Sequence, residues 1–195
     1  MSPNCLKRRL AQASAAVALV AACALPGVAA PAKASAAPAA PQVARKDLFW
    51  LEDADAPHRN PAWYFDNGLD PNVYIARPYA SPEARMRAFI AYARGIPAAV
   101  AQIRANIKTP LPISFVNYSV PGFRGFADYY TGDAKAAFAS VKDAALQAEF
   151  DAAAKVAADA MKDMAQWVEG QRATATNDFA LGADRFARML SATEA

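Results

Sequence analysis

The stretch EFDAAAKVAADAMKDMAQWVEGQ, residues 149–171, decides the fold class of this chain. Its apolar residues recur every three or four positions, with lysine and aspartate between them, which is the spacing of a helix that buries one face. The expected buried stripe contains Phe150, Ala153, Ala157, Met161, Met164, Trp167 and Val168. Alanine, which costs least to hold in a helix, fills other positions. The pattern therefore predicts a long amphipathic helix with Trp167 in its buried face.

A second helix is predicted to begin at Ser81, where three successive residues favour a helix start. Ser81 can cap the helix, Pro82 fits the first helical position, and Glu83 complements the positive end of the helix dipole. Apolar residues then recur at helical spacing as far as Ile107. Pro97 removes one helical donor, so we expect a kink or two abutting helices there.

Helical spacing continues through residues 113–130, with another break expected at Pro121 and a turn at Thr131–Asp133. A last helical pattern carries Phe186, Met189 and Leu190. No segment alternates like a half-buried strand over more than a few residues. Residues 47–80 are rich in proline and aromatic residues and follow neither period. We therefore predict an all-α fold, an antiparallel helical bundle with an irregular aromatic- and Pro-rich N-terminal segment.

Residues 1–36 predict a signal peptide and leader. Lys7–Arg9 forms the positively charged start, and Ala13–Leu25 forms the apolar region that follows. Small-x-small patterns end at Ala34 and at Ala36, and we expect cleavage after one of them. Export to the periplasm or the extracellular space follows from this prediction.

An alternative for the leader is lipidation. Val20–Cys23 resembles a bacterial lipobox, with Cys23 as the lipidated N-terminus, and only in that case do we expect membrane attachment. Against it, apolar residues continue past Cys23, where a lipoprotein usually turns polar. A retained membrane anchor is a further alternative, but the apolar stretch is short and Pro26-Gly27 breaks it.

The expected domain organisation follows from composition. Residues 37–46 are rich in alanine and proline and predict a flexible or semi-extended tether. Residues 47–195 are then one helical domain, a size that can bury a core.

Charge and cysteine content narrow the function classes. Four of the 21 basic residues and none of the 18 acidic residues lie in the leader, which leaves a net charge of −1 for the rest. A nearly neutral domain lacks the basic surface that nucleic acid requires, so we expect no nucleic-acid partner. Cys5 and Cys23 both lie in the leader, so the processed domain has no disulfide and no thiolate chemistry.

The sequence offers no recognised arrangement for catalysis. A zinc peptidase needs two histidines one helical turn apart, and this chain has one histidine, His58. It has no Gly-x-Ser-x-Gly motif and no Gly-rich phosphate loop. The acidic run at residues 52–55 departs from a calcium loop, because His58 stands at the turn-glycine position and Tyr64 at the closing-glutamate position. We therefore predict no catalytic, cofactor-binding or metal-binding residue, and a surface or loop-pinning role for His58.

Residues 175–190, ATNDFALGADRFARML, stand out as a motif. They resemble a recurrent motif of the family catalogued as domain of unknown function 885, which reads Gly-Asp-(Phe/Tyr)-x-(Leu/Ile)-Gly, then x-x-x-(Phe/Tyr)-x-x-x-Leu. Asn177 replaces the usual glycine. The matching residues are Asp178, Phe179, Leu181, Gly182, Phe186 and Leu190. With similar features upstream, the resemblance covers residues 60–190 and the N-terminal region of that family.

The resemblance implies an exported or lipid-anchored bacterial protein. Relatives in that family are several times longer than one domain, and their C-terminal half carries a His-Glu-x-x-Pro-Gly-His-His motif that resembles the zinc-binding helix of metallopeptidases. This chain contains no such motif. We therefore expect it to be the N-terminal helical portion of a metallopeptidase-like protein, with no catalytic site of its own and with zinc only in a full-length relative.

The apolar residues of the last predicted helix indicate which partners this chain would bind. Phe186, Met189 and Leu190 lie on a helix that is too short to be stable alone. We expect this stripe to bind the missing C-terminal portion. Without that portion, it would fold back on the bundle, pair with a second copy, or fray. The alternative function is a small periplasmic helical binding or interaction module, which an unrelated gene directly downstream would favour.

Overall fold

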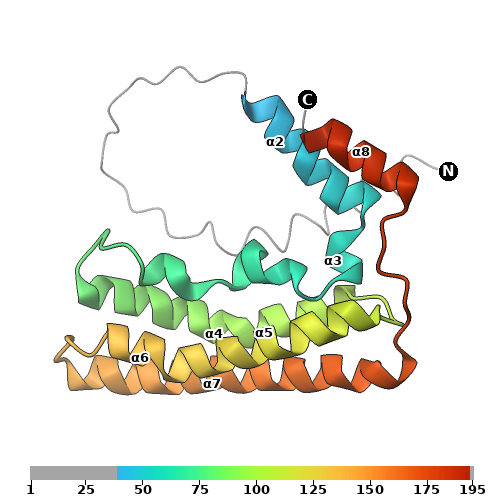
Figure 1. The fold of residues 1–195 in the computed structure, drawn as a ribbon. Coiled ribbons are helices and arrows are strands. Elements are labelled where there is room, and N and C mark those ends of the chain that lie inside the picture. The colour runs from blue at the N-terminus through green and yellow to red at the C-terminus, as the bar shows by residue number, and fades with distance from the viewer. Residues whose placement is uncertain (1–38, 194–195) are drawn as a thin grey trace, which may run out of the picture.

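The computed structural model describes residues 39–193, with side chains from Ala44 onward (Figure 1). The predicted cleavage sites Ala34 and Ala36 and the alternative lipidation site Cys23 lie outside the described residues. Within residues 39–193 every named element is helical, so the predicted all-α fold class is confirmed.

Three long helices form the body of the molecule, and the core runs along their contacting faces from end to end. They are α4 (Pro82–Asn106), α5 (Ile113–Thr131) and α7 (Ala144–Gly170). The short helix α6 (Asp133–Ala137) joins α5 to α7, and Gly132 forms the predicted turn before it. In Figure 1, α7 lies along both other helices. We call α4, α5 and α7 the three-helix body.

Side-chain pairs give the direction of the helices. Arg87 of α4 pairs with Asp143 at the start of α7 at 3.7 Å, and Arg94, further along α4, pairs with Glu149, further along α7, at 3.0 Å. Arg172, just past the end of α7, donates to Asn117 near the start of α5 at 2.6 Å. Thus α4 and α7 run in the same direction, and α5 runs antiparallel to both.

An aromatic cluster joins the helices at one end of the body. Phe89 of α4 lies 5.2 Å from Phe150 of α7 and 5.7 Å from both Tyr130 of α5 and Phe138, measured between ring centroids. All four rings are at most 1 % exposed. Tilted and edge-on aromatic pairs at such distances add to the stability that burial alone gives.

Helix α7 begins five residues before the predicted start at Glu149. The Asp143 carboxylate accepts from the Leu146 backbone N–H at 3.0 Å and so caps the helix. The predicted stripe is buried except for Trp167, which is only partly buried. Met164, Ala165 and Val168 occupy the centre of the contact face, and this leaves Trp167 on its flank.

Prolines do not divide the long helices. Of the kink or two abutting helices expected at Pro97, the abutting helices are ruled out, and the break expected at Pro121 is absent. Each of α4 and α5 is one assigned helix with its proline inside. Both prolines lie on the exposed side, away from the apolar stripe. Packing of the remaining residues on the buried side holds each helix together despite one missing donor. The predicted Ser81 cap is present, and its Oγ accepts from Ala84 N at 3.3 Å.

The N-terminal segment, predicted to be irregular over residues 47–80, is a series of short helical turns. They are η2 (Phe49–Asp53), α3 (Ala56–Arg59), η3 (Phe65–Leu69) and η4 (Pro71–Tyr74). Before them lies α2 (Ala39–Leu48), so the expected flexible or semi-extended tether over 37–46 is wrong for residues 39–46. Alanine favours a helix, and Pro41 falls in the first turn, where backbone N–H groups have no helical partner to lose.

Phe65 fastens this segment to the body. Its ring packs edge-on against Phe123 and Phe126 of α5, at 4.9 and 5.3 Å between centroids. A Cβ atom at Gly122 would lie 2.3 Å from the Phe65 ring. The ring therefore reaches α5 only because residue 122 has no side chain.

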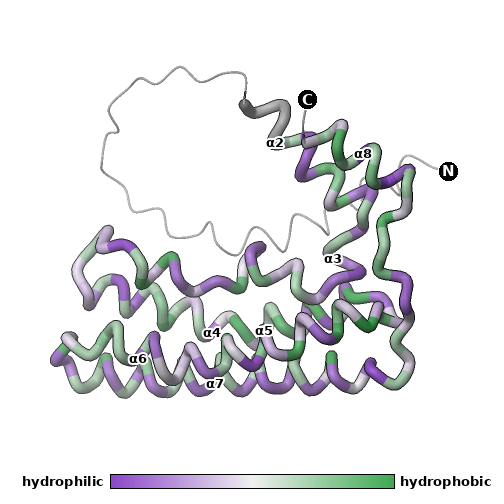
Figure 2. Tube along the Cα trace, viewed as in Figure 1, coloured by the Kyte–Doolittle hydropathy of each residue, from purple (hydrophilic) through white to green (hydrophobic). Residues whose placement is uncertain are grey.

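The chain leaves the body after α7 through η5 (Gln171–Thr174) and ends in α8 (Ala183–Thr193). Helix α8 lies beside α2, apart from the three-helix body (Figure 1). Apolar and polar residues alternate along α8 in Figure 2, yet none of its residues is buried. We call α2 and α8 together the α2–α8 arm.

Candidate functional site

The family motif begins where the chain leaves the body. Thr176 N donates to Leu111 O at 2.9 Å, and Ile113 N donates to Thr176 O at 2.8 Å, which fastens the chain to the α4–α5 connection. Arg59 of α3 then donates to the backbone oxygen of Asp178 at 2.9 Å and lies 3.4 Å from its carboxylate. The first motif residue is therefore held by the N-terminal segment.

Gly182 turns the chain into α8. Its φ of +79° is one that residues with a side chain rarely adopt. Phe186 N donates to Gly182 O at 3.0 Å, so the helical hydrogen bonds begin directly at this residue. The backbone therefore turns sharply at Gly182 and enters α8 directly.

The aromatic residues of the motif face outward. Phe179 is 57 % exposed and Phe186 is 50 % exposed, whereas Leu190 is partly buried. Leu48 and Leu51, from α2 and η2, are also exposed large apolar side chains. Exposed apolar side chains that gather on one part of a surface mark an interaction site or an aggregation liability.

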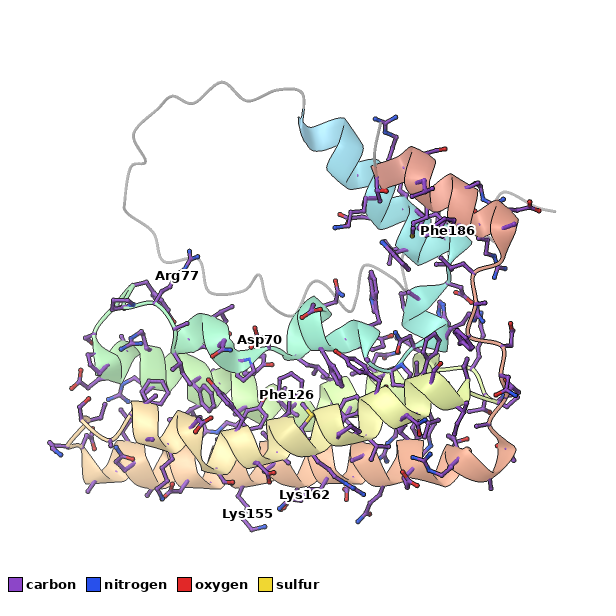
Figure 3. The ribbon with its side chains drawn as sticks, in the orientation of Figure 1. Asp70, Arg77, Phe126, Lys155, Lys162 and Phe186 are labelled. Carbon is purple, nitrogen blue, oxygen red and sulfur yellow. The ribbon has the colours of Figure 1, made fainter. Side chains whose placement is uncertain are left out.

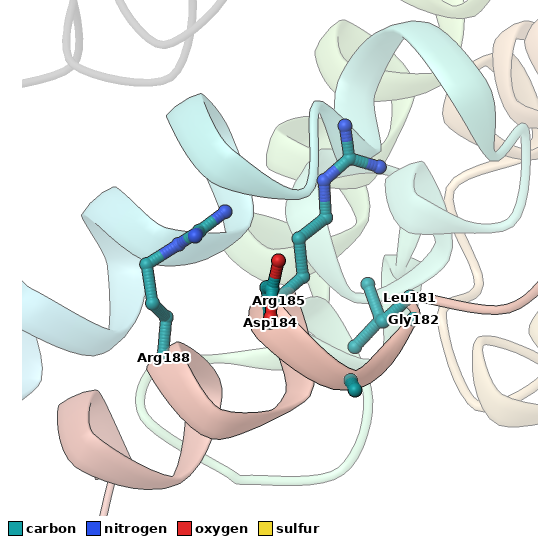
Figure 4. A pocket seen from close by; sticks show the side chains of 6 residues that line it. Leu181, Gly182, Asp184, Arg185 and Arg188 are labelled. Carbon is teal, nitrogen blue, oxygen red and sulfur yellow. The ribbon is translucent and has the colours of Figure 1, made fainter.

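A hollow of about 330 Å³ lies at the start of α8, and Figure 4 shows its lining. All of its lining residues come from Leu181–Arg185 and Arg188, so it is an open depression on one turn rather than a pocket between elements. Arg188 Nε donates to Asp53 Oδ1 at 3.0 Å and ties α8 to η2. This ion pair is exposed, and such pairs contribute about 0–1 kcal/mol.

A charged cluster lies where the N-terminal segment meets the end of α4. The Asp55 carboxylate accepts from His58 Nδ1 at 2.5 Å and from Lys108 Nζ at 2.7 Å, and Lys108 N donates to His58 O at 2.8 Å. Asp55 has a φ of +52°, a left-handed conformation that is uncommon outside glycine. His58 thus fastens a loop, which was one of the two roles expected for it.

The contacts in this cluster favour the ionised form of the Asp55 carboxylate. Partial burial by itself raises the pKa of Asp55, but the hydrogen bonds from Lys108 and His58 outweigh burial and lower the pKa below its ordinary value. The carboxylate is therefore ionised at neutral pH. We call Asp55, His58 and Lys108 the junction cluster.

A second hollow, of about 240 Å³, lies between η4 and α5. Its lining includes Asp70, Asn72, Gly122, Gly125, Phe126 and Tyr129. Figure 3 labels Asp70 and Phe126, which reach this hollow from the two sides. Asp70 Oδ1 accepts from Asn72 N at 2.9 Å, and the Tyr129 hydroxyl donates to Asn72 Oδ1 at 2.9 Å. We call it the Asp70 hollow.

Among the described residues, no group of three or more His, Cys, Asp and Glu side chains is placed to hold a metal ion. In that same part of the chain, none of the helices combines the length and the apolar character needed to cross a membrane.

Sequence reasoning did not find the junction cluster, the Arg59–Asp178 contact or the Asp70 hollow. Arg59 and Asp178 are 119 residues apart, and no local pattern joins them. One signal for the hollow was present, because Gly122, Gly125, Phe126 and Tyr129 fall on one face at helical spacing.

Comparison with known proteins bears on the whole chain. A family described as bacterial proteins of unknown function, DUF885, matches residues 1–195, so the resemblance predicted from the motif is confirmed. No curated protein and no solved structure matches the chain. The chain therefore belongs to the DUF885 family of bacterial proteins of unknown function.

Proposed function

We propose that this chain is the exported N-terminal helical portion of a metallopeptidase-like protein. In this proposal the three-helix body is a frame, the α2–α8 arm is a docking surface, and the chain has no catalytic site of its own. The family resemblance supports the proposal, because longer relatives place a zinc-peptidase-like motif in their C-terminal half. The occupant of the arm is then the portion that carries that motif.

One structural observation carries the docking role. The family motif does not end in the core but in an eleven-residue helix without a buried residue. Isolated helices of about 12 residues or fewer are marginal in water, and the contacts of α8 with α2 and η2 leave all of its residues unburied. A partner on the exposed side, over Phe179 and Phe186, would bury the remaining apolar surface.

The first test is the DNA that follows the gene. A frame that encodes a His-Glu-x-x-Pro-Gly-His-His stretch supports the proposal, and its product is then co-expressed with the full chain. We expect a complex that binds zinc, whereas the full chain alone binds none and cleaves no peptide. Peptide cleavage by the full chain that disappears on His58→Ala would contradict the non-catalytic role.

A matched pair of variants tests the docking surface. Phe186→Ser removes an exposed aromatic side chain from the arm, and Tyr79→Ser removes one from the loop before α4. Phe186→Ser should weaken the complex, and Tyr79→Ser should leave it unchanged. Equal effects of the two variants would place the interface elsewhere.

A second candidate function is a small periplasmic helical binding module. The Asp70 hollow favours it, because this hollow combines aromatic side chains with a carboxylate and lies away from the arm. An ordinary stop codon followed by an unrelated gene, with a ligand bound in the hollow, would favour this alternative.

A further inference from the structure

The Asp70 hollow has a floor without side chains. Gly122 and Gly125 stand three residues apart on α5 and therefore face the same side. A Cβ atom at Gly125 would meet nothing within 4 Å, so the space above it is open. At Gly122 the Phe65 ring fills the corresponding space. The hollow is thus bounded at one end by Phe65 and is open over Gly125.

Aromatic rings form its wall. Phe126 and Tyr129 follow Gly122 by four and seven residues, so they continue the same face of α5. Phe126 is held in place by Phe65, at 5.3 Å between ring centroids. The Tyr129 hydroxyl is held by Asn72 at 2.9 Å. Both rings are therefore positioned before any ligand arrives.

The charge at the rim is negative. Of the residues that line the hollow, Asp70 is the charged one, and its hydrogen bond from Asn72 N fixes the carboxylate there. Burial raises the pKa of the Tyr129 phenol, and the negative charges of Asp70 and Asp133 raise it further. Tyr129 therefore stays a neutral hydrogen-bond donor, and the local field disfavours an anion.

We propose that the Asp70 hollow binds an organic cation, an ammonium or guanidinium group. Aromatic faces attract such cations, and a carboxylate pairs with them through charge-assisted hydrogen bonds. The cation lies over Phe126 and Tyr129, above Gly125, with Asp70 as its counter-ion. Its source is either a free amine or a Lys or Arg side chain of a peptide. This inference does not rest on the docking role of the α2–α8 arm.

The experiment is an NMR titration of the full chain with three probes. Agmatine represents a free cationic amine, the peptide Ala-Ala-Arg-Ala-Ala represents a side chain, and 1-pentanol is a neutral apolar control. The expected result is a saturable shift of the amides of residues 70–72 and 122–129 with agmatine, with the peptide, or with both. The stronger of the two identifies the source. No shift with either cation, or an equal shift with pentanol, would overturn the proposal.

Variants assign the contacts without endangering the fold. Asp70→Asn keeps a side-chain oxygen for the Asn72 cap but removes the charge, and we expect affinity for the cation to fall about fivefold. Gly125→Leu fills the hollow from an open position of α5 and should abolish the shifts. Gly95→Leu, at an equally open glycine of α4, is its matched control. Unchanged binding in both Asp70→Asn and Gly125→Leu would show that the cation binds elsewhere.

Discussion

The three-helix body and the α2–α8 arm are built from similar amphipathic sequence, but they bury very different amounts of it. In α7, Met161, Met164 and Val168 are fully buried, because α4 and α5 cover the helix from two sides. Helix α8 contacts mainly the short elements α2 and η2 among those described, and none of its residues is buried. The difference shows that a hydrophobic stripe makes a helix able to pack. How far the neighbouring elements cover that stripe decides how much it adds to the free energy of unfolding.

Hydrogen exchange should show the largest difference between the two regions. Amides of residues 153–167 lie in the body and should open only with global unfolding, at a cost of about 5–15 kcal/mol. Amides of residues 183–192 lie in the arm and should exchange orders of magnitude faster, because little buried surface holds α8. Equal protection in a monomeric sample would mean that the arm is as stable as the body.

Truncation of one aromatic ring in each region should give the next largest difference. Phe150→Ala empties a fully buried site among Phe89 and Phe138, and it should lower the free energy of unfolding by about 3–5 kcal/mol. Phe186→Ala, at a half-exposed site of the arm, should cost below about 1 kcal/mol. Urea denaturation measures both values. A cost for Phe186→Ala close to that of Phe150→Ala would contradict the comparison.

Gly122 and Gly125 of α5 test how the N-terminal segment packs on the three-helix body, because Phe65 covers the first glycine and nothing covers the second. Gly122→Ala places a Cβ atom against the Phe65 ring and should destabilise the fold by about 1–3 kcal/mol, as overpacking does. Gly125→Ala has open space and should stabilise it by about 0.5–1 kcal/mol, because alanine favours the helix. Thermal melting of the two variants should shift in opposite directions. A loss of stability in both would mean that Phe65 is not the cause.

The junction cluster should give the smallest effect, and one that depends on pH. The folded-state pKa of Asp55 lies below its ordinary value of 3.8, so its charge stabilises the fold above that value. This contribution is lost as the pH falls through the folded-state pKa. We expect up to about 1 kcal/mol, since the side chain is partly exposed.

The variant Asp55→Asn isolates this contribution. Asparagine tolerates the left-handed backbone of residue 55, so the change removes charge with little strain. Unfolding free energies of the two proteins should differ at pH 7 and converge below the folded-state pKa. A difference that persists at low pH would indicate a conformational effect instead of a loss of charge.

Local sequence determined the helical elements. The stripe around Met161 and Met164 marks α7 because a 3.6-residue period puts these residues on one side whatever packs against them. Ser81 starts α4 because a cap acts within the first turn of its own helix. Gly182 allows the turn into α8 because a positive φ is a property of one residue.

Only the tertiary structure decided how these elements are used. Pro97 and Pro121 are compatible with continuous helices because both lie on the solvent side, and Trp167 is partly exposed because its neighbours occupy the centre of the α7 face. The Phe65 ring packs against Gly122, 57 residues later in the chain. Asp55 binds Lys108, 53 residues later. Such contacts depend on which surfaces meet after the helices pack. The periodicity of one segment contains no information about the segment that will cover it.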